Sequence, residues 1–389
     1  MKKNKNSLGL YIHWPYCESK CPYCDFNSHI NVPIDQKLWI EAYTNQLYEM
    51  RDHLQKYDLE HDGLNSIFFG GGTPSLMPLE IIDSVINLSL KIFNFSNDIE
   101  ISLEANPSSY EIRKFLDLKK IGINRLSIGV QSLNDHNLKF LGRLHNLNDI
   151  NNALDHASET FDNISTDLMY AFYGQNLNLW ISELETFLQK YNLKHISLYQ
   201  LTIEEGTKFF TDYKKGLITL IDNDEAYNFY SKTNKILNNY GFKRYEVSNY
   251  SKINFECKHN LNYWNSDNWI GIGPGAYGRI WKSRPDKQRI EYQNYKNPKT
   301  WLNKNVEKPN FEKINFLNCN DTDIDTLSMG LRLENGFEIS KLINYDFIES
   351  KQYKKLEKQK IIFKKDGFLK LDKNYIIKLN SIINYLIDF

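Results

Sequence analysis

The sequence predicts an α/β fold in which an open, partial (β/α)6 TIM-like barrel precedes a small winged-helix-like α+β domain. Between residues 8 and 200, short β-rich runs alternate with amphipathic helical segments, which is the pattern of βα units around a parallel sheet. Six such units are too few to close an eight-stranded barrel, so we expect an open, curved sheet. After residue 322 the pattern changes to helices around a short hairpin, which predicts a separate C-terminal unit.

The expected strands are short runs of apolar, β-branched and aromatic residues. They lie at residues 8–13, 65–69, 99–104, 125–129, 163–168 and 195–201. Helices are expected where apolar residues recur every three or four positions. The clearest stripes are Trp39, Tyr43, Leu47, Met50 and Leu54 within 36–56, then Ile181, Leu184 and Leu188, and a stripe from Ala226 to Tyr240 that Gly241 would end.

The chain after the barrel is less regular. Residues 221–322 are expected to extend the barrel and to end in a polar connector at about 282–322. The C-terminal domain is predicted to contain helices around 324–332, 338–344 and 347–358, a Lys-Asp-Gly turn at 365–367 between strands 361–363 and 368–371, and a last helix. Its mixed charge favours oligomerisation or docking over DNA binding. The predicted domains are therefore 1–220, 221–322 and 323–389.

Length, composition and charge limit the classes of function. The 389 residues fit two or three domains. Lys plus Arg and Asp plus Glu number 48 each, so the chain lacks the positive field that would attract nucleic acid or anionic lipid. The sequence contains neither a run of 18 apolar residues nor a start that resembles a signal peptide. We therefore expect a cytoplasmic protein that does not bind nucleic acid.

Three of the five cysteines, Cys17, Cys21 and Cys24, fall within eight residues just after the first expected strand. In a reducing compartment such packing indicates metal binding more than disulfides. Three thiolates can bind three irons of a [4Fe–4S] cluster and leave the fourth iron open to the amino and carboxylate groups of S-adenosylmethionine (SAM). The alternative is a Cys3His zinc site completed by His13 or His29, which the C-x3-C-x2-C spacing disfavours.

Glycine-rich and polar segments follow the next expected strands. The run from Gly70 to Thr73 comes after the second strand, where glycines would let the backbone approach a ligand, although a tight turn is the alternative. Polar side chains follow the third, fourth and fifth strands: Glu104, Gln131, Arg143 and Asp167. Functional residues of barrel-type folds gather at the carboxyl ends of strands. We therefore expect convergence on one ligand, with Glu104 on an ammonium or ribose hydroxyl and Arg143 on a carboxylate.

A last motif combines a histidine with aromatic residues. It begins at His259, continues to Tyr263 and Trp264, and is followed by a glycine cluster at 271–278. A histidine beside Tyr and Trp suits an axial ligand of haem iron. The alternative is a core histidine bonded within the protein, and the residues alone favour it. Cys257 and Cys319 receive no role.

Taken together, these motifs resemble those of the radical-SAM haem chaperones (HemW-type), which are relatives of oxygen-independent coproporphyrinogen III oxidase. The matching segments are YIHWPYC-x3-CPYCDFNSH, FFGGGTPS, LEANP, RLSIGVQS, GRLH, HNLNYW, GIGPGAYG and GLRLENGF. The resemblance covers nearly the whole chain and implies a barrel of the radical SAM type. It implies a cluster on Cys17, Cys21 and Cys24, SAM contacts from Tyr11, Tyr23, Gly71, Gly72, Thr73, Glu104, Gln131, Arg143 and Asp167, and haem binding by His259.

The resemblance also implies a function. The protein would bind haem and deliver it to apoproteins, with an electron donor for the cluster. A homodimer and peripheral contact with membrane haem proteins are further expectations. The alternative is an enzyme, the oxidase that decarboxylates coproporphyrinogen III. Phe26 favours the chaperone because the oxidases carry a fourth cysteine there, and so does the short stretch of 16 residues before Cys17.

One segment departs from the family pattern. After Asp167 the family usually has L-x-x-G-L-P-G-Q, whereas this chain has Leu168-Met-Tyr-Ala-Phe-Tyr-Gly-Gln175. A proline and a glycine are missing, so the geometry of this loop is open.

Overall fold

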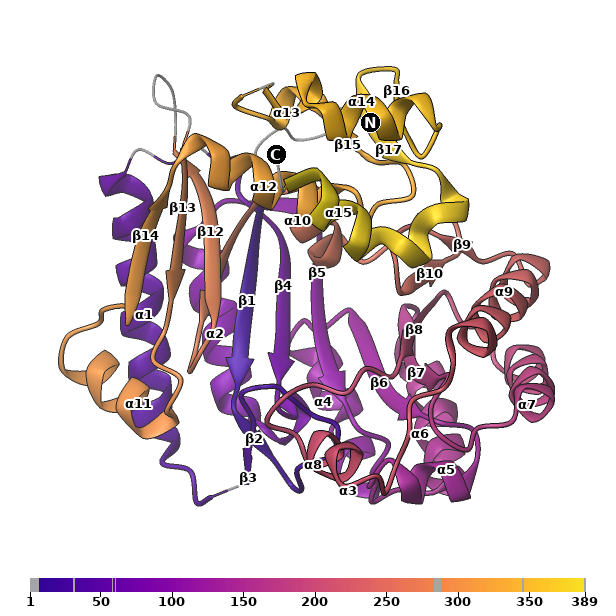
Figure 1. Ribbon diagram of the computed structural model, residues 1–389. Coiled ribbons are helices and arrows are strands. Elements are labelled where there is room, and N and C mark those ends of the chain that lie inside the picture. The colour runs from indigo at the N-terminus through magenta and orange to yellow at the C-terminus, as the bar shows by residue number, and fades with distance from the viewer. Residues whose placement is uncertain are drawn as a thin grey trace.

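The computed structural model describes residues 7–30, 32–57, 59, 61–282, 288–344 and 346–387 (Figure 1). Its centre is an open twelve-stranded sheet in the order β14-β13-β12-β11-β1-β4-β5-β6-β7-β8-β10-β9. Seven adjacent strands run parallel: β11 (Asn268–Ile272), β1 (Leu8–Trp14), β4 (Leu64–Gly71), β5 (Phe95–Ala105), β6 (Arg125–Gln131), β7 (Ile164–Tyr170) and β8 (His195–Gln200). All six strands expected from the sequence are among them, so the open α/β barrel is confirmed.

Helices connect the parallel strands and pack around the outside of the curved sheet (Figure 1). They are α1 (Gln36–Lys56), α2 (Leu79–Ile92), α3 (Ser109–Ile112), α4 (Phe115–Lys120), α5 (Asp135–Phe140), α6 (Leu147–Thr160), α7 (Leu177–Lys190) and α9 (Asn223–Asn239), whereas α8 (Lys208–Lys214) lies at the carboxyl end of the strands beside the cysteine segment (Figure 1). The α1 helix begins because Asp35 accepts hydrogen bonds from the first free backbone N–H groups. Its five predicted apolar residues are all buried against the sheet, which confirms the stripe at 36–56. None of the described helices could cross a membrane, given their length and polarity.

The polar stretch that the sequence suggested as a connector is part of the sheet instead. After α10 (Lys258–Trp264) and β11, an antiparallel edge is formed by β12 (Tyr277–Lys282), β13 (Gln288–Gln293) and β14 (Lys313–Leu317), with α11 (Pro298–Glu307) between the last two. Antiparallel strands near a sheet edge need fewer buried apolar residues than the central parallel strands. In β13 the buried apolar residues are Ile290 and Tyr292. At the other edge, β10 (Asn249–Ser251) and β9 (Lys243–Arg244) are also antiparallel.

The C-terminal helices and hairpin have a hydrophobic core of their own, which includes Leu327, Phe337 and Leu369. The elements are α12 (Cys319–Gly330), β15 (Phe337–Glu338), α13 (Asp346–Glu349), α14 (Lys351–Lys358), β16 (Ile362–Lys365), β17 (Phe368–Leu371) and α15 (Leu379–Ile387). The predicted hairpin is confirmed, and Asp366 and Gly367 both have positive φ in its turn. The helix expected at 338–344 is wrong. Only a 3-10 turn forms there, because Phe337 and Glu338 pair with β17.

The two ends of the barrel differ in what covers them. The arrows of β1, β4 and β5 point toward the segment that carries the cysteines, whereas the C-terminal helices lie at the opposite end, beside α10 (Figure 1). On α12, Asp325 accepts hydrogen bonds from Arg279 of β12 and from the fully buried Arg289 of β13. This ion cluster joins the C-terminal unit to the sheet. The boundaries 1–220, 221–322 and 323–389 remain a prediction.

Candidate functional site

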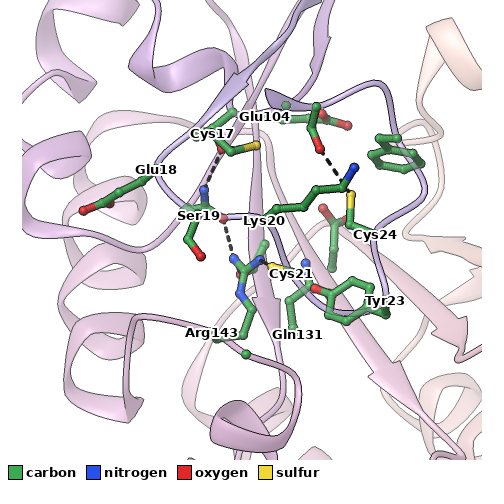
Figure 2. A pocket seen from close by; sticks show the side chains of 18 of the residues that line it. Cys17, Glu18, Ser19, Lys20, Cys21, Tyr23, Cys24, Glu104, Gln131 and Arg143 are labelled. Carbon is green, nitrogen blue, oxygen red and sulfur yellow. Dashed lines mark hydrogen bonds between the residues drawn. The ribbon is translucent and has the colours of Figure 1, made fainter. Parts of the chain in front are cut away.

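A cavity of about 590 Å³ lies at the carboxyl ends of the parallel strands. Its lining comes from the cysteine loop and from the ends of β4 to β8. The cysteine loop follows β1 and lies between the short strands β2 (Tyr16–Cys17) and β3 (His29–Ile30). Figure 2 shows the three cysteines, Tyr23, Gln131 and Arg143 around it. Of the site residues that the sequence suggested, the lining includes Cys17, Cys21, Tyr23, Cys24, Gly71, Gly72, Thr73, Glu104, Gln131, Arg143 and Asp167. The structure thus brings together residues that lie up to 150 positions apart.

Each of the three thiols has a polar neighbour. Thr73 donates a hydrogen bond from its hydroxyl to Cys17 Sγ (3.4 Å), and Arg143 donates from Nη1 to Cys21 Sγ (3.4 Å). Ser28 Oγ lies 3.8 Å from Cys24 Sγ. Burial raises the pKa of the Cys17 and Cys24 thiols. Donors that point at sulfur stabilise thiolates, which are the form that binds iron.

The thiols fit a cluster better than a single metal ion. Within the described ranges, no three His, Cys, Asp or Glu side chains are placed to share one ion. A zinc ion requires its ligands to meet at one point, whereas a [4Fe–4S] cluster binds each thiolate at a different iron. Both histidines of the zinc alternative have other contacts: His13 Nε2 is 2.9 Å from the Asn27 carbonyl oxygen, and His29 Nε2 is 3.3 Å from Asn27 Oδ1.

The glycines after β4 are required by the packing of the loop itself. Gly71 has φ +112°, and a Cβ atom there would lie 2.6 Å from the His13 ring. A Cβ at Gly72 would lie 2.7 Å from the Tyr16 carbonyl oxygen. The loop is tied to the cysteine segment because Gly72 N donates to the Trp14 carbonyl (2.7 Å). The expected close approach therefore occurs to the protein's own His13 ring and Tyr16 backbone, while the loop also lines the cavity.

Two half-buried carboxyl groups, those of Glu104 and Asp167, line the cavity. Burial, and then the charge of Asp167, raise the pKa of Glu104 to about 8, although the backbone N–H of Gly71 donates to its Oε2 (3.3 Å). Burial also raises the pKa of Asp167, which accepts from Ser127 Oγ (3.2 Å). Two acidic groups and the Arg143 guanidinium line the same cavity, which suits a ligand that carries both a cationic and an anionic group.

The comparisons with known proteins agree with this chemistry. A model of the Radical SAM superfamily matches residues 11–185. The heme chaperone HemW of Buchnera aphidicola subsp. Schizaphis graminum is 36% identical over 98% of both chains. The chain belongs to the HemW family. HemW of Buchnera aphidicola subsp. Acyrthosiphon pisum is 42% identical over 70% of each chain. Membership of the radical SAM superfamily implies a [4Fe–4S] cluster and SAM.

A solved structure shows the same fold. Coproporphyrinogen III oxidase (HemN) from Escherichia coli aligns with a TM-score of 0.78 at 20% identity, over 98% of this chain and 90% of that one. At this identity the likeness concerns the fold of the HemW-family chain and not its activity.

Two residues that the family resemblance placed at ligands lie outside the cavity lining. His259, on α10, is 1% exposed and lies within the barrel. Its Nδ1 is 2.9 Å from Ser66 Oγ and its Nε2 is 2.7 Å from Tyr263 Oη. Its ring stacks on Phe68 with centroids 5.1 Å apart, and burial lowers its pKa to about 3. An iron ligand needs a free ring nitrogen, whereas both ring nitrogens have partners in this conformation, as the core-histidine alternative expects; haem ligation by His259 stays a prediction.

Tyr11 is the second of these residues. Its ring lies beneath the glycine loop and packs against both Phe68 and His259, with centroids 6.3 and 6.2 Å away. A Cβ at Gly70 would lie 2.8 Å from this ring. Tyr11 therefore supports the loop from below and does not line the cavity.

The sequence reasoning missed several polar residues of the lining. Asn106 connects two of the thiol contacts, because its Nδ2 donates to Thr73 Oγ1 (3.2 Å) and its Oδ1 accepts from Arg143. Tyr199, at the end of β8, also lines the cavity. Both could have been found by looking for polar residues at more strand ends: Tyr199 lies near the end of the sixth expected strand, and Asn106 lies two residues after Glu104. Cys257, by contrast, is fully buried and donates to Glu100 Oε1 (3.3 Å).

Proposed function

We propose that this protein binds haem and transfers it to apoproteins, while a SAM-coordinated [4Fe–4S] cluster occupies the cavity. The observation that carries the proposal is the similarity to a relative named heme chaperone HemW over 98% of the chain. The cavity supports it, because three thiols, two half-buried carboxyl groups and a guanidinium line the same space.

The side chains of the cavity divide the work. The three cysteines would hold three irons, and the cluster with SAM supplies one-electron chemistry when bound. Glu104 and Asp167 would accept hydrogen bonds from ammonium and ribose hydroxyl groups. Arg143 would pair with a carboxylate of the ligand. Because Arg143 also donates a hydrogen bond to Cys21 Sγ, that carboxylate would lie close to the cysteine loop. An electron donor that reduces the cluster is a necessary partner.

The oxidase alternative is supported by the fold alone. Phe26, which stands where the oxidases were expected to carry a fourth cysteine, lines the mouth of the cavity and is 59% exposed. A thiol is therefore replaced by an apolar ring at this position. The homodimer, the cytoplasmic location and the peripheral contact with membrane haem proteins remain predictions.

The two functions are separated by one anaerobic experiment. Protein reconstituted with iron and sulfide is mixed either with haem and an apo-haem protein, or with coproporphyrinogen III, SAM and a reductant. We expect a Soret band that moves to the acceptor and no protoporphyrinogen. Turnover of coproporphyrinogen at about 1 per second, or even a hundredth of that rate, would overturn the proposal in favour of the enzyme. The same protein without its cluster is the control for whether transfer depends on the cluster.

A further inference from the structure

A satellite hydrophobic cluster, separate from the main core, lies next to the cysteine loop. Its buried members are Leu141, Met169, Phe172, Leu201, Phe209 and Ile218, and Tyr23, Phe140 and Ile203 pack against it. These residues come from the cysteine loop, from α5 and the turn after it, from β7 and the loop that follows, and from the segment around α8. No catalytic or ligand-binding task described above uses the phenylalanines of this cluster.

The aromatic rings form a continuous chain that ends at the cysteine loop. Phe172 stacks on Phe140 with centroids 5.8 Å apart and planes 18° apart. Phe140 lies 5.0 Å from Phe209, and Phe209 lies 6.3 Å from Tyr23. Tyr23 stands between Cys21 and Cys24 in the sequence, so the last ring contact acts on the turn that positions two of the three thiols. Aromatic pairs at these distances stabilise beyond their buried area.

The backbone of the same turn is held as well. Phe209 N donates a hydrogen bond to the Pro22 carbonyl (2.9 Å). On another side, Gly142 approaches the Pro22 ring so closely that a Cβ atom would lie 2.5 Å from Pro22 Cδ. Pro22 is thus fixed by α8 and by the turn after α5. Both contacts come from segments that contribute to the satellite cluster.

The loop that departs from the family pattern contributes to this cluster. Ala171 has φ +55°, a conformation that costs a non-glycine residue about 1–2 kcal/mol. Its N–H donates to Gln175 Oε1 (2.6 Å), which holds the turn. The next residue, Phe172, is 2% exposed and stacks within the ring chain. The altered loop therefore places an aromatic ring at the far end of the ring chain that reaches Tyr23.

We propose that Phe140, Phe172 and Phe209 form a clamp that fixes the turn at Pro22 and Tyr23. The clamp sets the positions of Cys21 and Cys24 and thereby determines how firmly the protein retains its iron–sulfur cluster. These phenylalanines are positioning residues, since none of them contacts a thiol. The inference rests on the proposal that the three cysteines hold the cluster.

Two measurements test the clamp. The first is the rate at which a ferrous chelator removes iron from anaerobically reconstituted protein. The second is hydrogen exchange of residues 17–24 in the apoprotein, which does not depend on the cluster. For Phe209→Ala we expect both rates to rise about tenfold or more, the ratio expected if the ring contact contributes about 1.4 kcal/mol to holding the turn closed. Phe209→Leu keeps most of the side-chain volume, so both rates should rise less than in Phe209→Ala. This variant replaces Phe209→Ala in the test if the alanine variant does not fold.

The matched control is Phe187→Ala. Phe187 is 6% exposed, close to the 4% of Phe209, but it packs in the main core beside Tyr191 (centroids 5.3 Å apart). We expect a similar loss of thermal stability with iron release and loop exchange close to those of the unchanged protein. Equal iron release from the Phe209 and Phe187 variants, or unchanged exchange at 17–24 in Phe209→Ala, would overturn the clamp. If the unchanged protein takes up no iron, the cluster proposal fails, while the exchange measurement still decides the clamp.

Discussion

Replacement of His259 by alanine separates a structural histidine from a haem ligand. In the structure the imidazole has two short hydrogen-bond contacts, to Ser66 Oγ and Tyr263 Oη, and is 1% exposed. Its loss leaves the fully buried hydroxyl group of Ser66 without that partner, which costs about 1–3 kcal/mol. It also removes the ring that stacks on Phe68, and a large buried ring replaced by alanine typically costs about 3–5 kcal/mol in all. We therefore expect His259→Ala to lower the free energy of unfolding by about 3–5 kcal/mol.

The assay measures unfolding and haem binding on the same protein. Urea unfolding of the apoprotein gives the change in stability, and a haem titration gives the Soret spectrum and the affinity of whatever remains folded. His136→Ala is the control, because His136 is exposed on α5 and a surface substitution changes stability by less than about 0.5 kcal/mol. We expect an unchanged Soret band in the folded fraction of His259→Ala. Near-normal stability combined with a shifted Soret band and weak haem binding would refute the structural role and make His259 a ligand.

Three further predictions concern the cluster, the buried acid and the ion cluster. Cys21→Ala should abolish the uptake of about four irons per chain and the brown chromophore, measured by iron analysis and absorbance; unchanged uptake would contradict the site. Because the pKa of Glu104 is raised to about 8, folding favours its protonated form and this stabilisation is lost as pH rises through 8. Glu104→Gln should match the unchanged apoprotein in unfolding free energy near pH 5 and exceed it by about 2–4 kcal/mol near pH 8; a pH-independent difference would be inconsistent with a raised pKa. Asp325→Ala leaves the buried Arg289 without its carboxylate and should lower the free energy of urea unfolding by about 3–5 kcal/mol. The control is Asp117→Ala in an exposed ion pair, which should lower it by less than about 1 kcal/mol, and equal losses would argue against a buried ion cluster.

Most of the parallel sheet could be predicted from the sequence, because buried strands and amphipathic helices leave a strong periodic signal. The stripe at 36–56 and the strand from Arg125 onward illustrate this. The edge strands could not be predicted in the same way. In β14 four of the five residues are exposed, so the sequence has no apolar pattern there. The strand is held by backbone hydrogen bonds with β13.

The sequence predicted those cavity residues that lie at or after the end of an expected strand. The cysteine spacing and the strand-end rule identified the lining around Glu104 and Arg143. The role of His259 could not be assigned from the sequence, because the same residue types suit a haem pocket and a buried hydrogen-bonded core. Only the partners of both ring nitrogens distinguish the two, and Ser66 lies 193 positions away in the sequence. The sequence also did not predict the cluster of Phe140, Phe172 and Phe209, because these residues lie on separate segments and no single periodic pattern connects them.

The position of β1 within the sheet has a consequence for how the chain acquires its structure during synthesis. This first strand lies between β4 and β11, with Leu8 opposite Asn268. The cysteine loop is supported from the same late region, because Asn27 Nδ2 donates to the carbonyls of Pro274 (3.0 Å) and Lys296 (2.9 Å). At typical rates of about 5–20 residues per second, a ribosome needs on the order of 10–50 s to reach these partners. The cysteine segment therefore leaves the ribosome early but gains its last contacts late in translation, and we expect iron loading to follow the formation of those contacts.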